Sequence, residues 1–398
     1  MSKYVEKLVK QARESSYRLA SLPAGKKNKI LIRMARALIE QGDFILRENK
    51  KDIISARKSN LNSSFIDRLA LNDKRLKEMS LCLREVAALP DPVGELLSSK
   101  RRPNGMIVNK VRVPIGVILI VYESRPNVTS DCVGLLFKSS NVGILRGGKD
   151  AVNSNRAVGK VLSGVLSQEK VDFPVFFVVD NTDRRVVGEL LKQDQHIDLV
   201  IPRGGESLIR RVVEESSIPV IKHYKGVCHI FVDQSADQKQ ALRICVNAKT
   251  QRPSVCNAVE TILVHKSIAE KFLPLLKGEF DRLVVQIRGD KKTCRLIPGI
   301  KKASAGDWSC EYLDLVVSIK VVADTDEAIR HINTYGSHHT DSIITKSRKN
   351  GGKFVKGVDS ACCFVNISTR FSDGHQFGLG AEIGISTDKL HARGPMGL

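Results

Sequence analysis

The regular alternation of short apolar runs and helix-like segments between residues 115 and 216 limits the fold of this chain more than any other feature. Ile115–Tyr122 is a nearly unbroken apolar run, typical of a strand that is buried on both faces of a parallel sheet. Further strands are expected at 142–145, 175–179 and 198–201, and helices at 129–139, 151–167, 184–192 and 206–216. Strands and helices in alternation predict a doubly wound parallel sheet of α/β class, whose ligands bind at the carboxyl ends of the strands.

A second α/β unit is expected further along the chain. Strand-like runs lie near 218–221, 228–232 and 259–264, a helical pattern covers 238–249, and the same alternation returns at 315–322 and 326–333. The predicted domains are therefore residues 1–240 and 241–365. Residues 366–398 are rich in glycine and show no clear helix, so we expect an active-site loop followed by an extended tail.

Helices are expected over residues 1–100, with an exposed hairpin after them. Apolar residues recur at helical spacing in Ile30–Ile39 and again in Leu76–Val86, which predicts amphipathic helices. Asn104-Gly105 is a turn signal, and the residues after it alternate between apolar and polar. We therefore predict an arm or hairpin near 103–116.

Cys256 is the candidate nucleophile. It lies in the loop Gln251–Asn257, between an expected helix and an expected strand, so its side chain can be both exposed and rigidly held. A thiolate attacks acyl carbons well, and Arg252 just upstream would favour the anionic form. The alternative is an inert core residue, because the chain has nine cysteines and most cysteines are small buried side chains.

The cysteines and histidines show no pattern of a disulfide framework or a metal site. There is no Cys-x-x-Cys, His338 and His339 are adjacent, and His375 and His391 lie in the glycine-rich tail. No metal is expected, and a reducing cytoplasm is the simplest setting. No run resembles a signal peptide or approaches the length of a membrane span, so no membrane partner is expected.

The chain is strongly basic, with 64 Lys and Arg against 43 Asp and Glu and a net charge of +21. Residues 1–112 hold 25 of the cations and 12 of the acids, a surplus of 25 − 12 = 13. A basic face can bind nucleic acid, attract an anionic substrate or simply be solvated. Because the cations are scattered between apolar residues and only 5% of the chain is aromatic, no stacking platform for nucleic acid is evident. We expect a solvated surface rather than a nucleic-acid partner.

Two glycine turns each end an expected strand and open an expected helix. Glycine lets backbone N–H groups approach a phosphate, and arginine and lysine add full positive charge. Neither turn fits Gly-x-Gly-x-x-Gly, so tight strand–helix connections are the alternative. The two turns are Arg146-Gly147-Gly148-Lys149 and Arg203-Gly204-Gly205.

A polar cluster, Tyr122–Asn127, lies at the carboxyl end of the first expected buried strand. A sheet protein can place a substrate there, and the Asn127 amide could donate a hydrogen bond to a developing oxyanion. The alternative is a helix cap followed by a proline-fixed turn.

Several motifs, in order along nearly the whole chain, closely resemble the γ-glutamyl phosphate reductases. This family, also called the glutamate-5-semialdehyde dehydrogenases, belongs to the aldehyde dehydrogenase superfamily and performs the second step of proline biosynthesis. The long tail motif is the most specific of them. The matching runs are Val117–Asn127 with Arg146-Gly147-Gly148, Gln251–Asn257, Glu311–Asp314, Ser368–Phe371, Gly378–Gly384 and Leu390–Leu398.

The resemblance implies NADPH-dependent reduction of L-glutamyl 5-phosphate in a cytoplasmic enzyme. Cys256 matches the catalytic cysteine, Asn127 the oxyanion asparagine, and Glu311 a glutamate near the nicotinamide ribose. The two glycine turns, with Arg146, Lys149 and Arg203, match cofactor-binding strand ends, so residues 1–240 would bind NADPH and 241–365 would carry catalysis. Arg125, Arg252 and Arg370 are candidates for holding the substrate's phosphate and carboxylate, because the planar guanidinium group suits both.

The resemblance also bears on partners. The arm near 103–116 and the tail would form an oligomerisation element, so a homodimer or homotetramer is expected, with glutamate kinase as a further possible partner. Family members continue for a short segment beyond the position of Leu398, and the loss of that segment would weaken a dimer.

One departure separates the chain from hydrolytic aldehyde dehydrogenases. Those enzymes carry a Glu-Leu-Gly-Gly motif whose glutamate activates water, whereas the corresponding stretch here, His223–Cys228, contains no carboxylate. That fits a reductase, which must not hydrolyse its acyl-enzyme. It argues against one alternative, a non-phosphorylating aldehyde dehydrogenase. A second alternative, a nucleic-acid-binding protein that has lost catalysis, would show salt-sensitive binding to random DNA.

Overall fold

The chain folds into two compact α/β units. The computed structural model describes residues 2–379, 382–389 and 394–396. Unit 1 comprises the described residues up to Lys222 together with those of 378–384 and Met396, and unit 2 comprises His223–Phe377 together with the described residues of 385–395. Among the described residues, no helix is both long and apolar enough to cross a membrane.

Unit 1 begins with helices, as predicted. The amphipathic stripe of α2 is buried and packs in one apolar cluster with Leu76, Met79 and Leu83 of α5. Asparagine caps start two of the helices, since the Asn62 and Asn72 side chains accept hydrogen bonds from backbone N–H groups of the first turn. The helices are α1 (Lys3–Ala20), α2 (Ala24–Glu40), α3 (Gly42–Lys58), α4 (Ser63–Leu69) and α5 (Asp73–Ala88).

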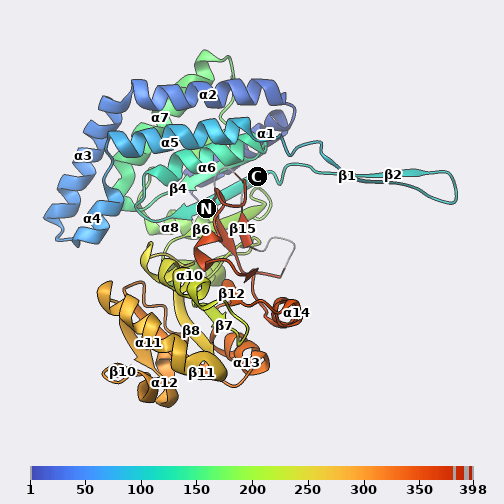
Figure 1. The fold of residues 1–398 in the computed structure, drawn as a ribbon. Helices are drawn as coiled ribbons and strands as arrows, with labels where there is room; N and C mark the ends of the chain where they lie inside the picture. The colour runs from blue at the N-terminus through green and yellow to red at the C-terminus, as the bar shows by residue number, and fades with distance from the viewer. Residues whose placement is uncertain (1, 380–381, 390–393, 397–398) are drawn as a thin grey trace. The chain divides into compact units, whose positions relative to one another are not determined.

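A two-stranded hairpin follows and extends away from the helices of unit 1 (Figure 1). Strand β1 (Leu96–Arg101) pairs antiparallel with β2 (Ile107–Val111), and Gly105 takes a positive φ of 86° in the turn between them. The expected arm is therefore present. The expectation of helix up to residue 100 is wrong over its last residues, because 96–101 pair across the turn instead of coiling. Every residue of both strands is exposed.

The remainder of unit 1 is a four-stranded parallel sheet in the order β5-β4-β3-β6. All six residues of the central strand, β3, are buried. The chain adds β4 and β5 on one side of β3 and then returns to add β6 on the other, which creates a topological switch point. The strands are β3 (Val117–Tyr122), β4 (Val142–Arg146), β5 (Phe176–Val178) and β6 (Leu199–Arg203).

The connecting helices of this sheet lie where the apolar pattern placed them. They are α6 (Asn127–Lys138), α7 (Val152–Gln168), α8 (Arg184–Leu190) and α9 (Glu206–Glu215), with a 3-10 turn η1 (Lys149–Ala151) before α7. The strand expected near 218–221 is wrong, because that segment makes only an isolated bridge between Val220 and Val200.

Unit 2 contains a seven-stranded sheet in the order β10-β9-β11-β8-β7-β12-β13, and its pairings are parallel. Strand β7 pairs with β8 and β12 inside this sheet, so the second unit begins well before the predicted boundary at residue 240. The strands are β7 (Cys228–Val232), β8 (Val259–His265), β9 (Gln286–Gly289), β10 (Lys301–Lys302), β11 (Val316–Val322), β12 (Thr340–Ile344) and β13 (Cys362–Val365).

Helices accompany the strands of this sheet. They are α10 (Gln238–Thr250), α11 (Lys266–Arg282), α12 (Lys291–Leu296), α13 (Thr325–Tyr335) and α14 (Arg348–Gly357), with 3-10 turns η2 (Ala305–Ser309) and η3 (Thr369–Phe371). The glycine-rich tail adds two short strands, β14 (Gly384–Ser386) and β15 (Gly394–Met396), which pair with each other. The described residues of the tail are mostly loop, as expected, while 380–381, 390–393 and 397–398 lie outside the described residues.

Candidate active site

Cys256 lies in a short loop of unit 2 between helix α10 and strand β8. Helix α10 is capped by Asp237 and buries Ala241, Cys245 and Ala248, and all seven residues of β8 are buried. The loop is closed by a hydrogen bond of 3.0 Å from the Ala258 N–H to the Val255 carbonyl. Cys256 itself is only partly buried. The nucleophile candidate is thus held at both ends by core elements while the residue itself stays partly exposed.

Residues 223–228, which lead into β7, contact the backbone of the Cys256 loop. A Cβ atom added at Gly226 would lie 1.9 Å from the Cys256 carbonyl oxygen, so only glycine fits there. The Cys228 thiol donates a hydrogen bond of 3.2 Å to the same oxygen, and burial raises the pKa of Cys228 well above its usual range, which keeps the donor protonated. The Gly226 N–H donates to Glu311 Oε1 at 2.8 Å. Glu311, predicted as a cofactor residue, therefore also supports the segment that holds Cys256.

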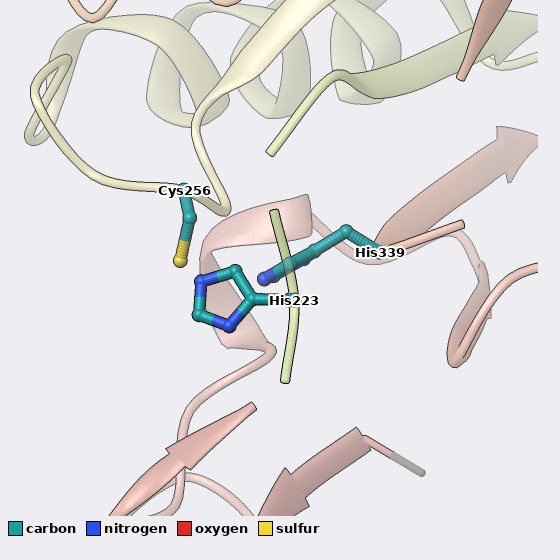
Figure 2. Close-up of side chains that lie close together, drawn as sticks. All are labelled: His223, Cys256 and His339. Carbon is teal, nitrogen blue, oxygen red and sulfur yellow. The ribbon is translucent and has the colours of Figure 1, made fainter. Parts of the chain in front are cut away.

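Two histidines converge on Cys256 (Figure 2). One donor atom from each of His223, Cys256 and His339 lies within 4.8 Å of the other two. The His223 Nδ1 lies 2.8 Å from the Ile385 carbonyl oxygen, and the two imidazole rings meet edge to face at 5.5 Å. His339 is fully buried, and burial lowers its pKa to about 3, so it is neutral at pH 7. This cluster of nitrogen and sulfur donors is the kind of group that zinc prefers.

Sequence reasoning missed this cluster. His339 directly precedes β12, and His223 lies before β7, more than a hundred residues earlier in the chain. No spacing rule links them, because they meet only when β12 pairs with β7 in the sheet.

Arginine side chains lie beside the cysteine loop. Arg370 Nε donates to Gln251 Oε1 at 3.2 Å, and the guanidinium also donates to Asn257 Oδ1. Asn257 Nδ2 in turn donates to the Ser372 carbonyl at 2.9 Å, which fixes the amide. Burial, and then the nearby charge of Arg252, lower the pKa of Arg370. Two of the three predicted substrate arginines thus lie near Cys256, where positive charge favours a thiolate.

A buried ion pair joins α10 and β8, the two elements that flank the Cys256 loop. Lys249 and Glu260 are both fully buried, and Nζ lies 2.6 Å from Oε2. Glu260 Oε1 also accepts a hydrogen bond of 3.3 Å from the Leu313 N–H, so the pair connects α10, β8 and the segment that carries Glu311. Burial raises the pKa of Glu260 to about 7. No pattern in the sequence predicts this pair, because each residue alone resembles a solvated charge.

Unit 1 carries a cavity of about 320 Å³ at the carboxyl ends of β3 and β4, beside the switch point of its sheet. Among its lining residues are four basic side chains, Arg146, Lys149, Arg184 and Arg211, and two acidic ones, Glu123 and Asp150. Arg146 is buried, its pKa is lowered by that burial, and its Nε has no partner among the described residues. Arg184 and Arg211 were not predicted, since helix positions carrying arginine are usually solvated.

Packing accounts for three of the four glycines in the two turns, whereas a Cβ at Gly205 would make only an ordinary contact of 3.4 Å with Glu123. A Cβ at Gly147 would meet the Asn155 amide at 2.1 Å, and one at Gly148 would meet Ser124 Oγ at 2.4 Å. A Cβ at Gly204 would meet Glu123 at 2.7 Å. Gly148 also lines the cavity.

Two acidic side chains, Glu123 and Glu382, contact the second turn, Arg203-Gly204-Gly205. The Gly205 N–H donates to Glu123 Oε1 at 2.7 Å, and Arg203 Nη1 lies 3.9 Å from Glu382 Oε1. Arg203, Gly204 and Gly205 are absent from the residues that line the 320 Å³ cavity. Their predicted cofactor role stays a prediction.

Asn127 and Arg125 lie in unit 1, at the start of α6. Asn127 is exposed, and its Nδ2 donates to Asp131 Oδ2 at 3.0 Å, one turn further along the helix. Arg125 is also exposed. Both side chains stand at the end of the buried strand β3, as expected, and their roles toward substrate remain predictions.

Fold and site together define a class of protein. A switch-point cavity with basic lining in one α/β unit, and a supported cysteine loop in a second, suit a nucleotide-dependent enzyme that works through a thiol. The family model described as "Aldehyde dehydrogenase family" matches residues 1–312. The chain belongs to the aldehyde dehydrogenase family.

Its more specific likeness is to γ-glutamyl phosphate reductases. The chain is 52% identical over 394 residues to the γ-glutamyl phosphate reductase of Caldanaerobacter subterraneus subsp. tengcongensis, covering 99% of this chain and 95% of that one. Against the enzyme of Thermodesulfovibrio yellowstonii the identity is 53%, with coverage of 98% and 93%. The crystal structure of the Thermotoga maritima γ-glutamyl phosphate reductase matches with a TM-score of 0.96 and 46% identity over 99% of this chain and 95% of that one.

Proposed function

We propose that this chain reduces L-glutamyl 5-phosphate to L-glutamate 5-semialdehyde and phosphate with NADPH, the second step of proline biosynthesis from glutamate. The observation that carries the proposal is the cysteine loop. Cys256 is partly exposed, its carbonyl is fixed by Cys228 and Gly226, and the side chain that faces it from the 223–228 segment is an imidazole and not a carboxylate. The relatives named above carry the same activity in their names.

The first step is attack by Cys256. The thiol gives its proton to solvent, and the sulfur forms a bond to the acyl carbon of the substrate while the bond from that carbon to the phosphate oxygen breaks. Phosphate leaves and a thioester remains. Arg252 and Arg370 stabilise the thiolate before attack, because their positive charges lie near the loop.

Charge then develops on the carbonyl oxygen of the substrate. The backbone N–H of Cys256 is the first donor that we assign to this oxyanion, and the Asn127 amide is the second. Losing one such donor typically lowers the rate by about 10²–10³-fold. After reduction, the tetrahedral species collapses, the carbon–sulfur bond breaks, and Cys256 is regenerated as the aldehyde leaves.

The reductant is assigned to the basic cavity of unit 1. NADPH, when bound, supplies the hydride that converts the thioester carbon to the aldehyde level. The residues that would hold it are Arg146, Lys149, Arg184 and Arg211, whose positive charges suit the pyrophosphate and the extra ribose phosphate. The Nε of buried Arg146 has no partner among the described residues and fits such a ligand, since a buried donor gains from a hydrogen-bonding partner. Arg203, Gly204, Gly205 and Glu311 complete the proposed cofactor set.

The substrate is a dianionic phosphate joined to an amino acid. Arg370 and Arg252 are assigned to its charged groups in unit 2, and Arg125 is assigned to them in unit 1. Arg370 is the best supported of the three, because Gln251 and Asn257 hold its guanidinium in place beside the loop.

The test is the reverse reaction. Glutamate 5-semialdehyde is mixed with phosphate and NADP⁺, and NADPH absorbance is followed for the unmodified chain and for Cys256→Ala. Phosphate-dependent turnover that disappears in the variant supports both the reaction and the nucleophile. Turnover without phosphate would indicate a non-phosphorylating dehydrogenase, and no turnover from a folded protein would overturn the assignment.

Partners and location complete the proposal. The exposed hairpin β1–β2 presents apolar side chains, among them Leu96, Ile107 and Val108, which suits contact with a second copy of the chain. We therefore propose a homo-oligomer in the cytoplasm that receives its labile substrate from glutamate kinase. Sedimentation of the chain alone and with glutamate kinase tests both contacts.

A further inference from the structure

We propose that Cys256, His223 and His339 together bind a thiophilic divalent cation, with Zn²⁺ as the preferred ion, and that the bound ion blocks the nucleophile reversibly. The three donor atoms lie within 4.8 Å of one another, and Figure 2 shows the three side chains converging. Two imidazole nitrogens and one thiolate are a typical donor set for zinc, and three protein ligands leave a fourth position open.

The hydrogen bonds at Nδ1 leave Nε2 as the available donor atom on each histidine. The Ile385 carbonyl can only accept, so His223 Nδ1 carries the proton in their 2.8 Å contact and Nε2 keeps its lone pair. His339 Nδ1 lies 2.9 Å from Thr340 Oγ1, while His339 Nε2 is buried without a partner among the described residues. Metal-binding histidines usually have their second nitrogen fixed by a carbonyl or hydroxyl in this way.

Only small movements would close the site. Tetrahedral zinc, with Zn–N distances of about 2.0–2.1 Å and Zn–S of about 2.3 Å, places its ligand atoms about 3.3–3.6 Å apart. From separations of at most 4.8 Å, each pair has to approach by at most about 1.5 Å. His223 and Cys256 are only partly buried, so their side chains have room to rotate, while buried His339 provides the fixed point.

Binding would change the chemistry of the sulfur. The Cys256 thiol releases its proton to solvent and forms a bond to the ion, so its lone pair is no longer available for the acyl carbon. The block on turnover rests on the proposed function of Cys256, whereas the binding itself does not. A direct binding measurement therefore separates failure of this inference from failure of the proposed function.

The experiment uses the full chain after treatment with a chelator. Co²⁺ is added as a spectroscopic probe, and a thiolate-to-cobalt charge-transfer band with the visible bands of a tetrahedral site is expected. Adding Zn²⁺ should remove these bands. Zn²⁺ should also slow the alkylation of Cys256 by iodoacetamide, measured by mass spectrometry of the peptide that contains it, and a chelator should restore the alkylation rate.

Two variants test proposed ligands and a third serves as the control. Cys256→Ser should abolish the charge-transfer band, and His223→Gln should weaken Co²⁺ binding by about tenfold or more. His375→Gln is the matched control, because His375 is exposed and lies outside the cluster, and it should bind like the unmodified chain. Circular dichroism confirms that each variant is folded. A band that persists in Cys256→Ser, unchanged binding in His223→Gln, or no protection of Cys256 by Zn²⁺ would each overturn the proposal.

Discussion

A single methyl group added at Gly226 should remove most of the activity of this chain. The added Cβ would lie 1.9 Å from the Cys256 carbonyl oxygen and 2.4 Å from its Cα, whereas ordinary contacts begin near 3.4 Å. The two backbone segments must therefore separate by roughly 3.4 − 1.9 = 1.5 Å. Gly226 is not among the residues with positive φ, so the effect is a clash and not backbone strain.

The size of the effect follows from that displacement. A misplacement of about 1 Å in a catalytic group lowers the rate by about 10²-fold, or about 2.7 kcal/mol of transition-state stabilisation. Overpacking costs a further 1–3 kcal/mol, roughly, in the free energy of unfolding. Moving the 223–228 segment would also lengthen the 3.2 Å hydrogen bond from Cys228 and the 2.8 Å bond to Glu311.

The assay compares Gly226→Ala with Gly278→Ala. Gly278 lies within helix α11, and nothing lies within 4 Å of an added Cβ there, so alanine should stabilise the protein by about 0.5–1 kcal/mol without changing activity. Three quantities are measured for each variant: kcat/KM of the reverse reaction, the alkylation rate of Cys256 and the thermal midpoint. If Gly226→Ala keeps kcat/KM and alkylation within twofold of the unmodified chain, the reasoning about this contact is refuted.

Three further predictions concern charges. Burial raises the pKa of Glu260 from 4.5 to about 7, so its contribution to stability is complete below pH 4.5 and is lost as the pH rises through 7. In urea titrations across this window, the free energy of unfolding should fall by up to about 3 kcal/mol, and Glu260→Gln should abolish this fall. The same dependence of the free energy of unfolding on pH in both proteins would contradict the prediction. Arg184→Ala should raise the KM for NADPH by about tenfold and leave the KM for NADH nearly unchanged, because we assign Arg184 of the cavity lining to the extra ribose phosphate, which NADH lacks. Equal changes for both cofactors would disprove this role. Arg370→Ala should raise the KM for phosphate in the reverse reaction by about tenfold or more. Arg370→Lys should restore little of the affinity for phosphate, because lysine lacks the planar guanidinium group. Full rescue by lysine would show that charge alone suffices.

Much of the fold followed from local pattern. Runs such as Val117–Tyr122 are apolar throughout because both faces of a parallel strand are buried, and the helices between them carry one apolar stripe. The helix expectation failed at 96–100, where residues with no strong local preference adopt the strand that the Asn104-Gly105 turn imposes. The unit boundary was misplaced because β7 resembles any other buried strand, and only its pairing with β8 and β12 assigns it to the second sheet.

The sequence alone singled out Cys256 as the candidate nucleophile, since its loop motif and the tail motif resemble one family of enzymes, and it predicted the α/β class, since periodicity is a local property. Tertiary structure alone decided what surrounds the cysteine. His223 and His339 meet because β7 and β12 are paired, Gly226 is required because two backbone segments touch, and Lys249 and Glu260 lie together because a helix packs on the strand that follows it. Contacts between residues far apart in the chain depend on how strands pair and helices pack, and no spacing along the sequence records that.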